Sequence, residues 1–381
     1  MAIRPNLRTL AAVAAAGLAL TACGSSNSSS TGATGGTCGN YKLAFLGATT
    51  GDYGALGQNM VGGINVALDK YNKAHADCKI TLKTYDSQGD PTKATPLATQ
   101  IVQDDSIVGL IGPGFSGESL ATGKTFAAAG LPSISPSATN VTITQQGWTT
   151  WHRVIGNDSA QGAAAASYML NTVKSTNPFV IDDGSDYGKG LASYVKDGLG
   201  STLKSGNTDT VQTGQTDFSA TVSKVNASKA DAVFYGGYYA EAGLLVKQLR
   251  QAGYKGLFMS GDGSEDPAFV KAAGSAANGA ILTAPAGPAP ADFDSTYQSV
   301  NNAPSGLYST QAYDAANIFL AGIAAGKTSH ADLNSFVGAY SGDGVSGPIA
   351  FDKFGDIKES VIFAYKVANG KLDTANPTPI S

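Results

Sequence analysis

Small hydroxyl residues follow two apolar runs in the first half of the chain. Ser116 lies in the segment Gly112–Gly117 and Thr139 in the segment Ser135–Asn140, each at the end of an apolar run. Ser116 would begin a helix, where free backbone N–H groups and the helix dipole favour an anion. With the exposed backbone around Ala138, these two hydroxyls could bind a carboxylate without any arginine. Taken one at a time, each hydroxyl is better explained by ordinary helix capping.

The segment Gly112–Gly117 also matches the pattern G-x-G-x-x-G of dinucleotide-binding loops. It follows the third apolar run rather than the first, and Pro113 stiffens it. The acidic residue that would bind a ribose about 20 residues later is missing, because Leu131–Ala138 contains no acid. We therefore expect no NAD binding and no other cofactor.

Different side chains follow the apolar runs in the second half. These runs are Phe179–Ile181, Ala232–Tyr235 and Leu257–Met259. Tyr187, Tyr238 and Asp262 come after them in that order. Two phenols and a carboxylate suit a ligand ammonium, through charge-assisted hydrogen bonds and aromatic enclosure, although Gly-Asp-Gly alone is usually a turn. Anion donors in one half and a cation acceptor in the other predict a site for a zwitterion.

Short β-type runs alternate with stretches of helical periodicity from Tyr41 onward. The first four predicted strands are Lys42–Leu46, Ile80–Tyr85, Ile107–Ile111 and Pro132–Ser135. The pattern repeats from about Asn157 and is followed by a helix, Tyr308–Ala324, and two late strands, Gly347–Phe351 and Val361–Val367. Strands that alternate with helices in this way predict parallel sheets. We therefore predict an α/β fold of two doubly wound lobes, with the ligand at the carboxyl ends of the strands.

The composition is consistent with this organisation and excludes several functions. The 381 residues suffice for roughly two domains of about 150 residues each. A net charge of −4, without any run of five or more Lys/Arg, argues against a nucleic-acid partner. The sequence lacks Gly-x-Ser-x-Gly, a paired His/carboxylate motif and metal-ligand spacing, and its histidines lie away from the predicted strand ends. We expect neither an enzyme nor a metal site.

The N-terminus has the pattern of an export signal. Arg4 and Arg8 precede an apolar run, Leu10–Leu20, that is too short to span a bilayer as a helix. The sequence that ends at Cys23 resembles a bacterial lipobox, which implies cleavage before Cys23 and lipidation of its sulfur. The Gly/Ser-rich segment Gly24–Gly36 would then be a flexible tether. The alternative is an ordinary secretory peptide followed by a chance cysteine.

Two further cysteines, Cys38 and Cys78, each precede a predicted strand. An even pair in an exported chain predicts a disulfide bond. If the two strands are adjacent and parallel, both cysteines lie at the same edge of one sheet. The alternative is a pair of free buried thiols.

The chain from about Tyr41 to Leu372 resembles the leucine/isoleucine/valine-type periplasmic binding proteins of bacterial ABC transporters. The matching segments are Leu46–Gly51, Tyr85–Pro91, Ile111–Ser116, Pro136–Thr139, Asp158–Gly162, Tyr187–Gly188, Tyr235–Tyr238 and Gly347–Phe351. Their order and spacing carry the resemblance rather than any single segment. The resemblance implies the type I fold, in which two lobes are joined by a hinge of several crossings.

The resemblance also implies roles for individual residues. The carboxylate would bind to Ser116, to the backbone of Ser137 and to Thr139, and the ammonium to Asp262. Beside Asp262, Tyr238 would line the site, Tyr187 would close it, and Tyr308 would line the side-chain pocket. The acid at position 262 is commonly Glu in this family, so the shorter Asp leaves the identity of the ligand open.

These observations predict a lipid-anchored, extracytoplasmic solute-binding protein that acts as a monomer. Its partners would be a zwitterionic ligand, an ABC permease and ATPase, and the membrane through the lipid. The alternative is a surface chemoreceptor protein that signals through a separate sensor. The predicted parts are a signal peptide (1–22), a tether (23–37), an N-lobe (38–157 and about 285–345) and a C-lobe (158–284 and about 346–375).

Overall fold

The structure is a computed structural model, and it describes residues 39–381. Its first sheet contains five parallel strands in the order β2-β1-β3-β4-β5. The strands are β1 (Lys42–Gly47), β2 (Thr81–Asp86), β3 (Ile107–Ile111), β4 (Ser133–Ser135) and β5 (Trp151–Arg153). The short β5 was not predicted, because a buried Arg153 within Trp-His-Arg does not resemble an apolar run.

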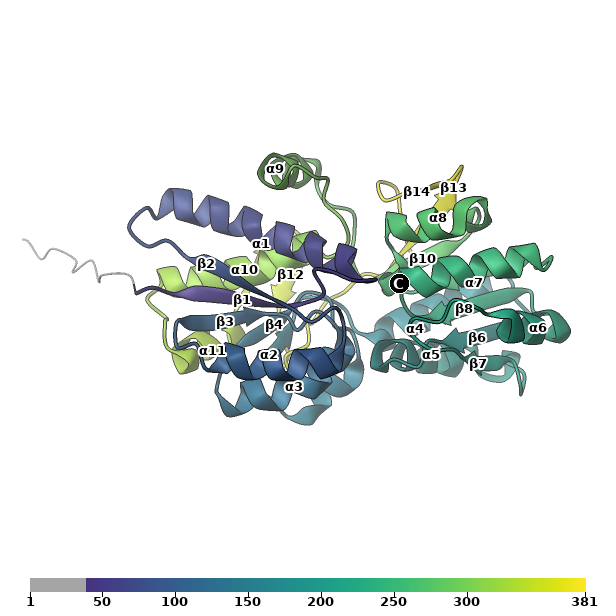
Figure 1. Cartoon of the computed structure of the whole chain (residues 1–381), viewed down its shortest axis with the longest axis horizontal. Coiled ribbons are helices and arrows are strands. Elements are labelled where there is room, and N and C mark those ends of the chain that lie inside the picture. Colours follow the sequence, from purple (N-terminus) through teal and green to yellow (C-terminus); the bar gives the residue numbers. More distant parts are fainter. Residues whose placement is uncertain (1–38) are drawn as a thin grey trace, which may run out of the picture. The chain divides into compact units, whose positions relative to one another are not determined.

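Helices cover both faces of this sheet (Figure 1). Leu43 and Phe45 on β1 share a core with α1 (Gly54–Ala74) and α10 (Ser309–Ala324). Ala44 and Leu46, which alternate with them along β1, pack instead with α2 (Pro91–Val102) and α3 (Ser116–Ala128). Burial on both faces explains the nearly continuous apolar sequence of the strand, since side chains alternate between the two sides.

The second sheet has the order β14-β13-β10-β9-β8-β6-β7. Its strands are β6 (Pro178–Asp182), β7 (Thr208–Thr210), β8 (Ala232–Gly236), β9 (Leu257–Ser260), β10 (Ile281–Ala284), β13 (Phe363–Ala368) and β14 (Lys371–Leu372), with β15 (Thr378–Pro379) paired to β13. Strands β6 to β10 pair in parallel and β13 pairs antiparallel to β10. The accompanying helices are α4 (Asp158–Ser167), α5 (Asp186–Leu199), α6 (Ser219–Ser228), α7 (Tyr239–Gln251) and α8 (Pro267–Ala273).

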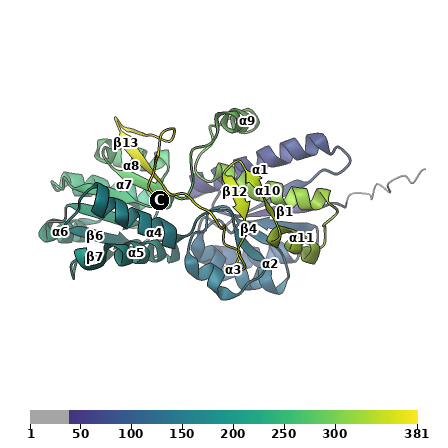
Figure 2. The ribbon, with the colours of Figure 1, turned by 180° about the vertical axis from the view of Figure 1, so that it is seen from behind.

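The chain passes between the two sheets three times (Figure 2). The first passage joins β5 to α4, and the second leads from β10 through α9 (Ala291–Asn301) to α10. The third joins β12 (Gly347–Ala350) to β13. The sequence did not reveal that β12 forms an antiparallel hairpin with β11 (Ser341–Gly344), nor that α11 (His330–Gly338) precedes that hairpin. Within residues 39–381, no helix has the length and apolar character needed to cross a membrane.

Candidate ligand-binding site

A small cavity with a volume of about 10 Å³ lies where strand ends of the two sheets meet, and we call it the inner cavity. Six of the eight predicted binding residues line it: Ser116, Ser137, Tyr187, Tyr238, Asp262 and Tyr308. Four further residues complete the lining: Leu56, Met60, Gly114 and Phe115. Ser116 and Ser137 follow strands of the first sheet, whereas Tyr187, Tyr238 and Asp262 follow strands of the second. The cavity therefore brings together hydroxyl groups from one lobe and a carboxyl group from the other.

The hydroxyl side of the inner cavity is built on the N-terminus of α3. Ser116 is the first residue of this helix, and its Oγ accepts a hydrogen bond from the Asn140 backbone N–H at 3.3 Å. The hydroxyl of Ser137 donates to the Gly114 carbonyl at 2.7 Å. Buried Glu118 holds the turn before the helix, because it accepts from the Phe115 backbone N–H at 3.2 Å. This side offers hydroxyl and amide dipoles without a cationic side chain, which suits a carboxylate.

Ala138 and Thr139 do not line the inner cavity. The backbone N–H of Ala138 donates to Ser135 Oγ at 3.0 Å, so this amide is already engaged. Thr139 is fully buried, and its carbonyl accepts from the Asp158 backbone N–H at 2.9 Å. The Thr139 side chain interacts with the buried carboxyl group of Asp158.

Asp262 supplies the acidic side, and it is 1% exposed. Its Oδ1 accepts a hydrogen bond from the Tyr187 hydroxyl at 2.7 Å, and its Oδ2 accepts from the Tyr308 hydroxyl. Burial raises the pKa of Asp262, and the hydroxyls of Tyr308 and Tyr187 oppose that shift. A ligand ammonium beside this carboxyl group would favour its charged form, which is the arrangement expected of a cation acceptor.

Aromatic rings surround the space between the two polar sides. The ring of Tyr238 lies 4.6 Å from that of Tyr53, 5.1 Å from that of Tyr187 and 5.5 Å from that of Phe115, measured between centroids. Phe115 and Tyr53 were not among the binding residues predicted from the sequence. Both satisfy the criterion used for the other residues, because Tyr53 follows β1 and Phe115 directly precedes Ser116.

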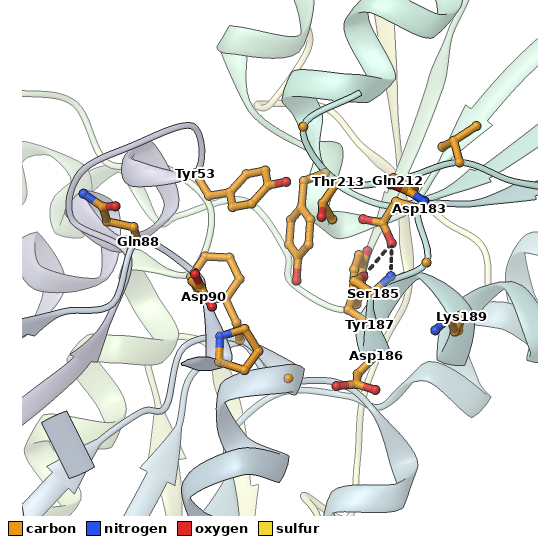
Figure 3. Close-up of a pocket in the computed structure, with 18 of the residues that line it drawn as sticks. Tyr53, Gln88, Asp90, Asp183, Ser185, Asp186, Tyr187, Lys189, Gln212 and Thr213 are labelled. Carbon is orange, nitrogen blue, oxygen red and sulfur yellow. Dashed lines mark hydrogen bonds between the residues drawn. The ribbon is translucent and has the colours of Figure 1, made fainter. Parts of the chain in front are cut away.

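A second and larger cavity, the outer cavity, has a volume of about 790 Å³. Phe115, Tyr187 and Tyr238 line both cavities, so the two spaces adjoin across these three rings. Figure 3 shows that side chains of both lobes line the outer cavity, among them Tyr53 and Asp90 from the first lobe and Asp183 from the second. Its volume lies within the range of small-molecule sites.

The sequence of the chain matches the model of the family described as "Periplasmic binding protein" over residues 40–371. The chain belongs to the periplasmic binding protein family. It is 34% identical over 326 residues to the leucine-specific-binding protein of Salmonella typhimurium, covering 83% of this chain and 88% of the relative. It is 31% identical over 324 residues to the Leu/Ile/Val-binding protein of Escherichia coli K12, with the same coverage.

Solved structures of the family share the fold. The branched-chain amino acid transporter substrate binding protein LivJ of Streptococcus pneumoniae, in complex with isoleucine, has a TM-score of 0.81 at 25% identity, covering 90% of this chain and 100% of that one. The leucine binding protein LivK of Thermotoga maritima has a TM-score of 0.79 at 26% identity, covering 88% and 98%. The predicted fold class, the two-lobed type I α/β fold, is therefore confirmed.

Proposed function

We propose that this protein is the solute-binding component of an ABC importer and captures an amino acid or similar zwitterion by closing two lobes around it. The observation that carries the proposal is the inner cavity, where Asp262 of one lobe lies across from Ser116 and Ser137 of the other. The relatives named above bind leucine, isoleucine or valine, so these amino acids are the first ligands to test.

In this proposal the ligand ammonium binds to Asp262, in place of one tyrosine hydroxyl. The carboxylate binds to Ser116 and the backbone of Ser137. Thr139 holds the loop Ser135–Asn140 in place through its interaction with Asp158. A ligand that contacts both lobes stabilises the closed form more than the open one, and this difference drives closure. Tyr187, Tyr238 and Tyr308 then separate the ligand from water.

Cys23, the tether and Cys38 lie outside the described residues, so the lipid anchor and the extracytoplasmic tether stay predictions. The monomeric state and the permease and ATPase partners are predictions as well. Cys78 is disulfide-bonded, which supports its pairing with Cys38. The separation of β1–β5 from β6–β10 into different sheets supports the proposed N-lobe (38–157 and about 285–345) and C-lobe (158–284 and about 346–375) except at one boundary. Because β12 pairs with β11 and Asp356 pairs with Arg153 of β5, the last segment of the N-lobe extends to about residue 357 rather than 345.

Thermal unfolding with added ligand tests the proposal. The chain without its predicted signal peptide is denatured and refolded to remove any ligand, then screened against the twenty amino acids and related amides and amines. A ligand at about 100 times its dissociation constant adds about 2.7 kcal/mol to the free energy of unfolding. We expect such a shift with at least one zwitterion. A folded protein that responds to none of them contradicts the proposed function.

A further inference from the structure

The outer cavity contains more acid than base. Its lining includes three acids, Asp90, Asp183 and Asp186, and one cation, Lys189. Asp90 caps α2 by accepting from the Thr92 backbone N–H at 2.8 Å, and Asp186 lies exposed in the first turn of α5. These two carboxyl groups have ordinary roles at helix ends. Asp183 differs from them because it is only 1% exposed.

One oxygen of Asp183 has hydrogen-bond partners and the other has none. Oδ1 accepts from the backbone N–H of Ser185 at 2.9 Å and from its hydroxyl at 2.5 Å, as the dashed lines in Figure 3 show. Oδ2 is buried without any hydrogen-bond partner, although the residue lines the cavity. A buried carboxyl oxygen without a partner is unfavourable and uncommon in a folded protein. Oδ2 is therefore an acceptor that a hydrogen-bond donor of a ligand could satisfy.

Glu241 and Tyr235 interact electrostatically with Asp183, and each also has a buried oxygen atom without a hydrogen-bond partner. Glu241 Oε1 accepts from the Tyr53 hydroxyl at 2.9 Å and from the Gly214 backbone N–H at 2.6 Å, whereas its Oε2 is buried without a partner. The buried hydroxyl of Tyr235 also lacks a partner. Glu241 and Asp183 interact electrostatically, and both interact with Tyr53. Among the ion pairs of residues 39–381, none includes Asp183 or Glu241.

We propose that the outer cavity is a second subsite, which binds a primary ammonium or guanidinium group at the far end of an elongated ligand. This inference rests on the proposed function, because the amino-acid head of the same ligand binds at Asp262 and Ser116. The apolar part of the ligand passes the rings of Phe115, Tyr187 and Tyr238, which line both cavities. The terminal cation donates to Asp183 Oδ2, beside Glu241.

The chemistry of the cavity favours an organic cation. Charge-assisted hydrogen bonds to a carboxylate are about twice as strong as neutral ones, and aromatic rings attract the cation on its way to the acid. Burial raises the pKa of Asp183 to about 7, and a bound cation would lower it again. Within residues 39–381, no group of three or more His, Cys, Asp or Glu side chains could hold a metal ion.

Lysine and norleucine are the matched probes, because they share a linear side chain and differ in the terminal ammonium. Calorimetry on the refolded, ligand-free protein should give a dissociation constant for lysine that is about tenfold or more below that for norleucine. Asp183→Asn keeps the acceptor for Ser185 and removes the charge. We expect this variant to lose most of the preference for lysine while its affinity for norleucine stays the same. Asp197→Asn, an equal charge change at an exposed position of α5, serves as the control.

The outcomes separate this inference from the proposed function. If leucine or norleucine binds the wild type and lysine binds no more tightly, the second subsite is wrong and the proposed function stands. If Asp183→Asn weakens both probes equally, the residue supports the fold and the inference is also wrong. The comparison of probes on the wild type does not depend on the variant's folding. If a folded wild type binds no amino acid at all, the proposed function itself fails.

Discussion

The hydroxyl of Tyr53 donates a hydrogen bond to Glu241 Oε1 at 2.9 Å, joining residues that are 188 positions apart in the sequence. Tyr53 follows the first strand of the first sheet, and Glu241 lies in the first turn of α7 beside the second sheet. The contact therefore links the two lobes at the edge of the cavities. The ring of Tyr53 also packs at 4.6 Å on that of Tyr238, which lines both.

Tyr53→Phe should weaken ligand binding by roughly three- to tenfold, because the contact between the lobes loses one hydrogen bond to a carboxyl group while the ring contact remains. Calorimetry with the ligand found in the screen measures the change. Tyr340→Phe is the control, since Tyr340 lines neither cavity. Equal effects of the two substitutions would contradict a role for the Tyr53–Glu241 contact in closure.

Asp262→Ala should weaken binding by several kcal/mol, because a ligand ammonium would lose its counter-charge in a buried site. The same substitution frees the hydroxyls of Tyr187 and Tyr308, so the stability of the unliganded variant is measured by urea unfolding in parallel. Asp292→Ala, at an exposed position of α9, controls for the loss of one negative charge. Unchanged affinity in Asp262→Ala would show that the ammonium binds elsewhere.

Ser116→Ala should weaken binding by roughly 1–3 kcal/mol, the range for one hydrogen bond to a charged group. Thr139→Val should have a smaller effect on affinity, because Thr139 does not line the inner cavity. Calorimetry with the same ligand on both variants shows which substitution lowers the affinity more. A larger loss in Thr139→Val would mean that the loop around Thr139 rearranges when the ligand binds.

Arg153→Leu should lower the free energy of unfolding by about 3–5 kcal/mol, since the Arg153 side chain is fully buried and its ion-pair partner Asp356 is 19% exposed. The Arg153 guanidinium also donates to the carbonyls of Ala138 and Asn140 at 2.9 and 3.0 Å, so the loop that includes Ser137 should loosen as well. Lys224→Leu removes an exposed pair with Asp209 and should change stability by less than about 1 kcal/mol. Urea unfolding measures both, and equal changes would contradict this ranking.

The unliganded protein should lose stability as the pH rises from about 4 to about 7. Burial raises the pKa of Glu118, Asp158 and Asp183 to about 7 each, whereas a carboxyl group in the unfolded chain titrates near 4. Within this window the folded state retains protons that the unfolded state releases, so folding becomes less favourable as the pH increases. Each of the three carboxyl groups contributes about 4 kcal/mol over this window, and His152, whose pKa burial lowers to about 4, opposes them by a similar amount.

Urea unfolding between pH 4 and pH 8 measures this slope. In Asp158→Asn the slope should be shallower, because that group no longer titrates. Asp158 interacts with Asp262 and Arg153, so the variant's ligand affinity is measured separately. Asp197→Asn, the same change at an exposed position of α5, is the control. A stability that rises over the same pH range would contradict the assignment of buried, protonated carboxyl groups.

The positions of Ser116, Tyr187 and Asp262 could be predicted because they depend on local features. Short apolar runs mark buried parallel strands, and the residues that follow such strands collect at one edge of each sheet. The same reasoning could have included Tyr53 and Phe115, which also follow strands. It failed for β5, which contains the buried Arg153. The partner of Arg153 is Asp356, which lies 203 positions away, so no local pattern indicates that the arginine can be buried.

The sequence by itself determined the alternation of strands and helices in each lobe, the family, and the residue types available at most strand ends. Only the tertiary structure decided which of those side chains share a cavity: it directs Thr139 toward Asp158 and leaves Ser137 in the lining. It also decided that Asp183 is buried with one oxygen lacking a partner. The physical reason is that local periodicity fixes elements, whereas side-chain direction, burial and partners depend on contacts between lobes that are far apart in the chain.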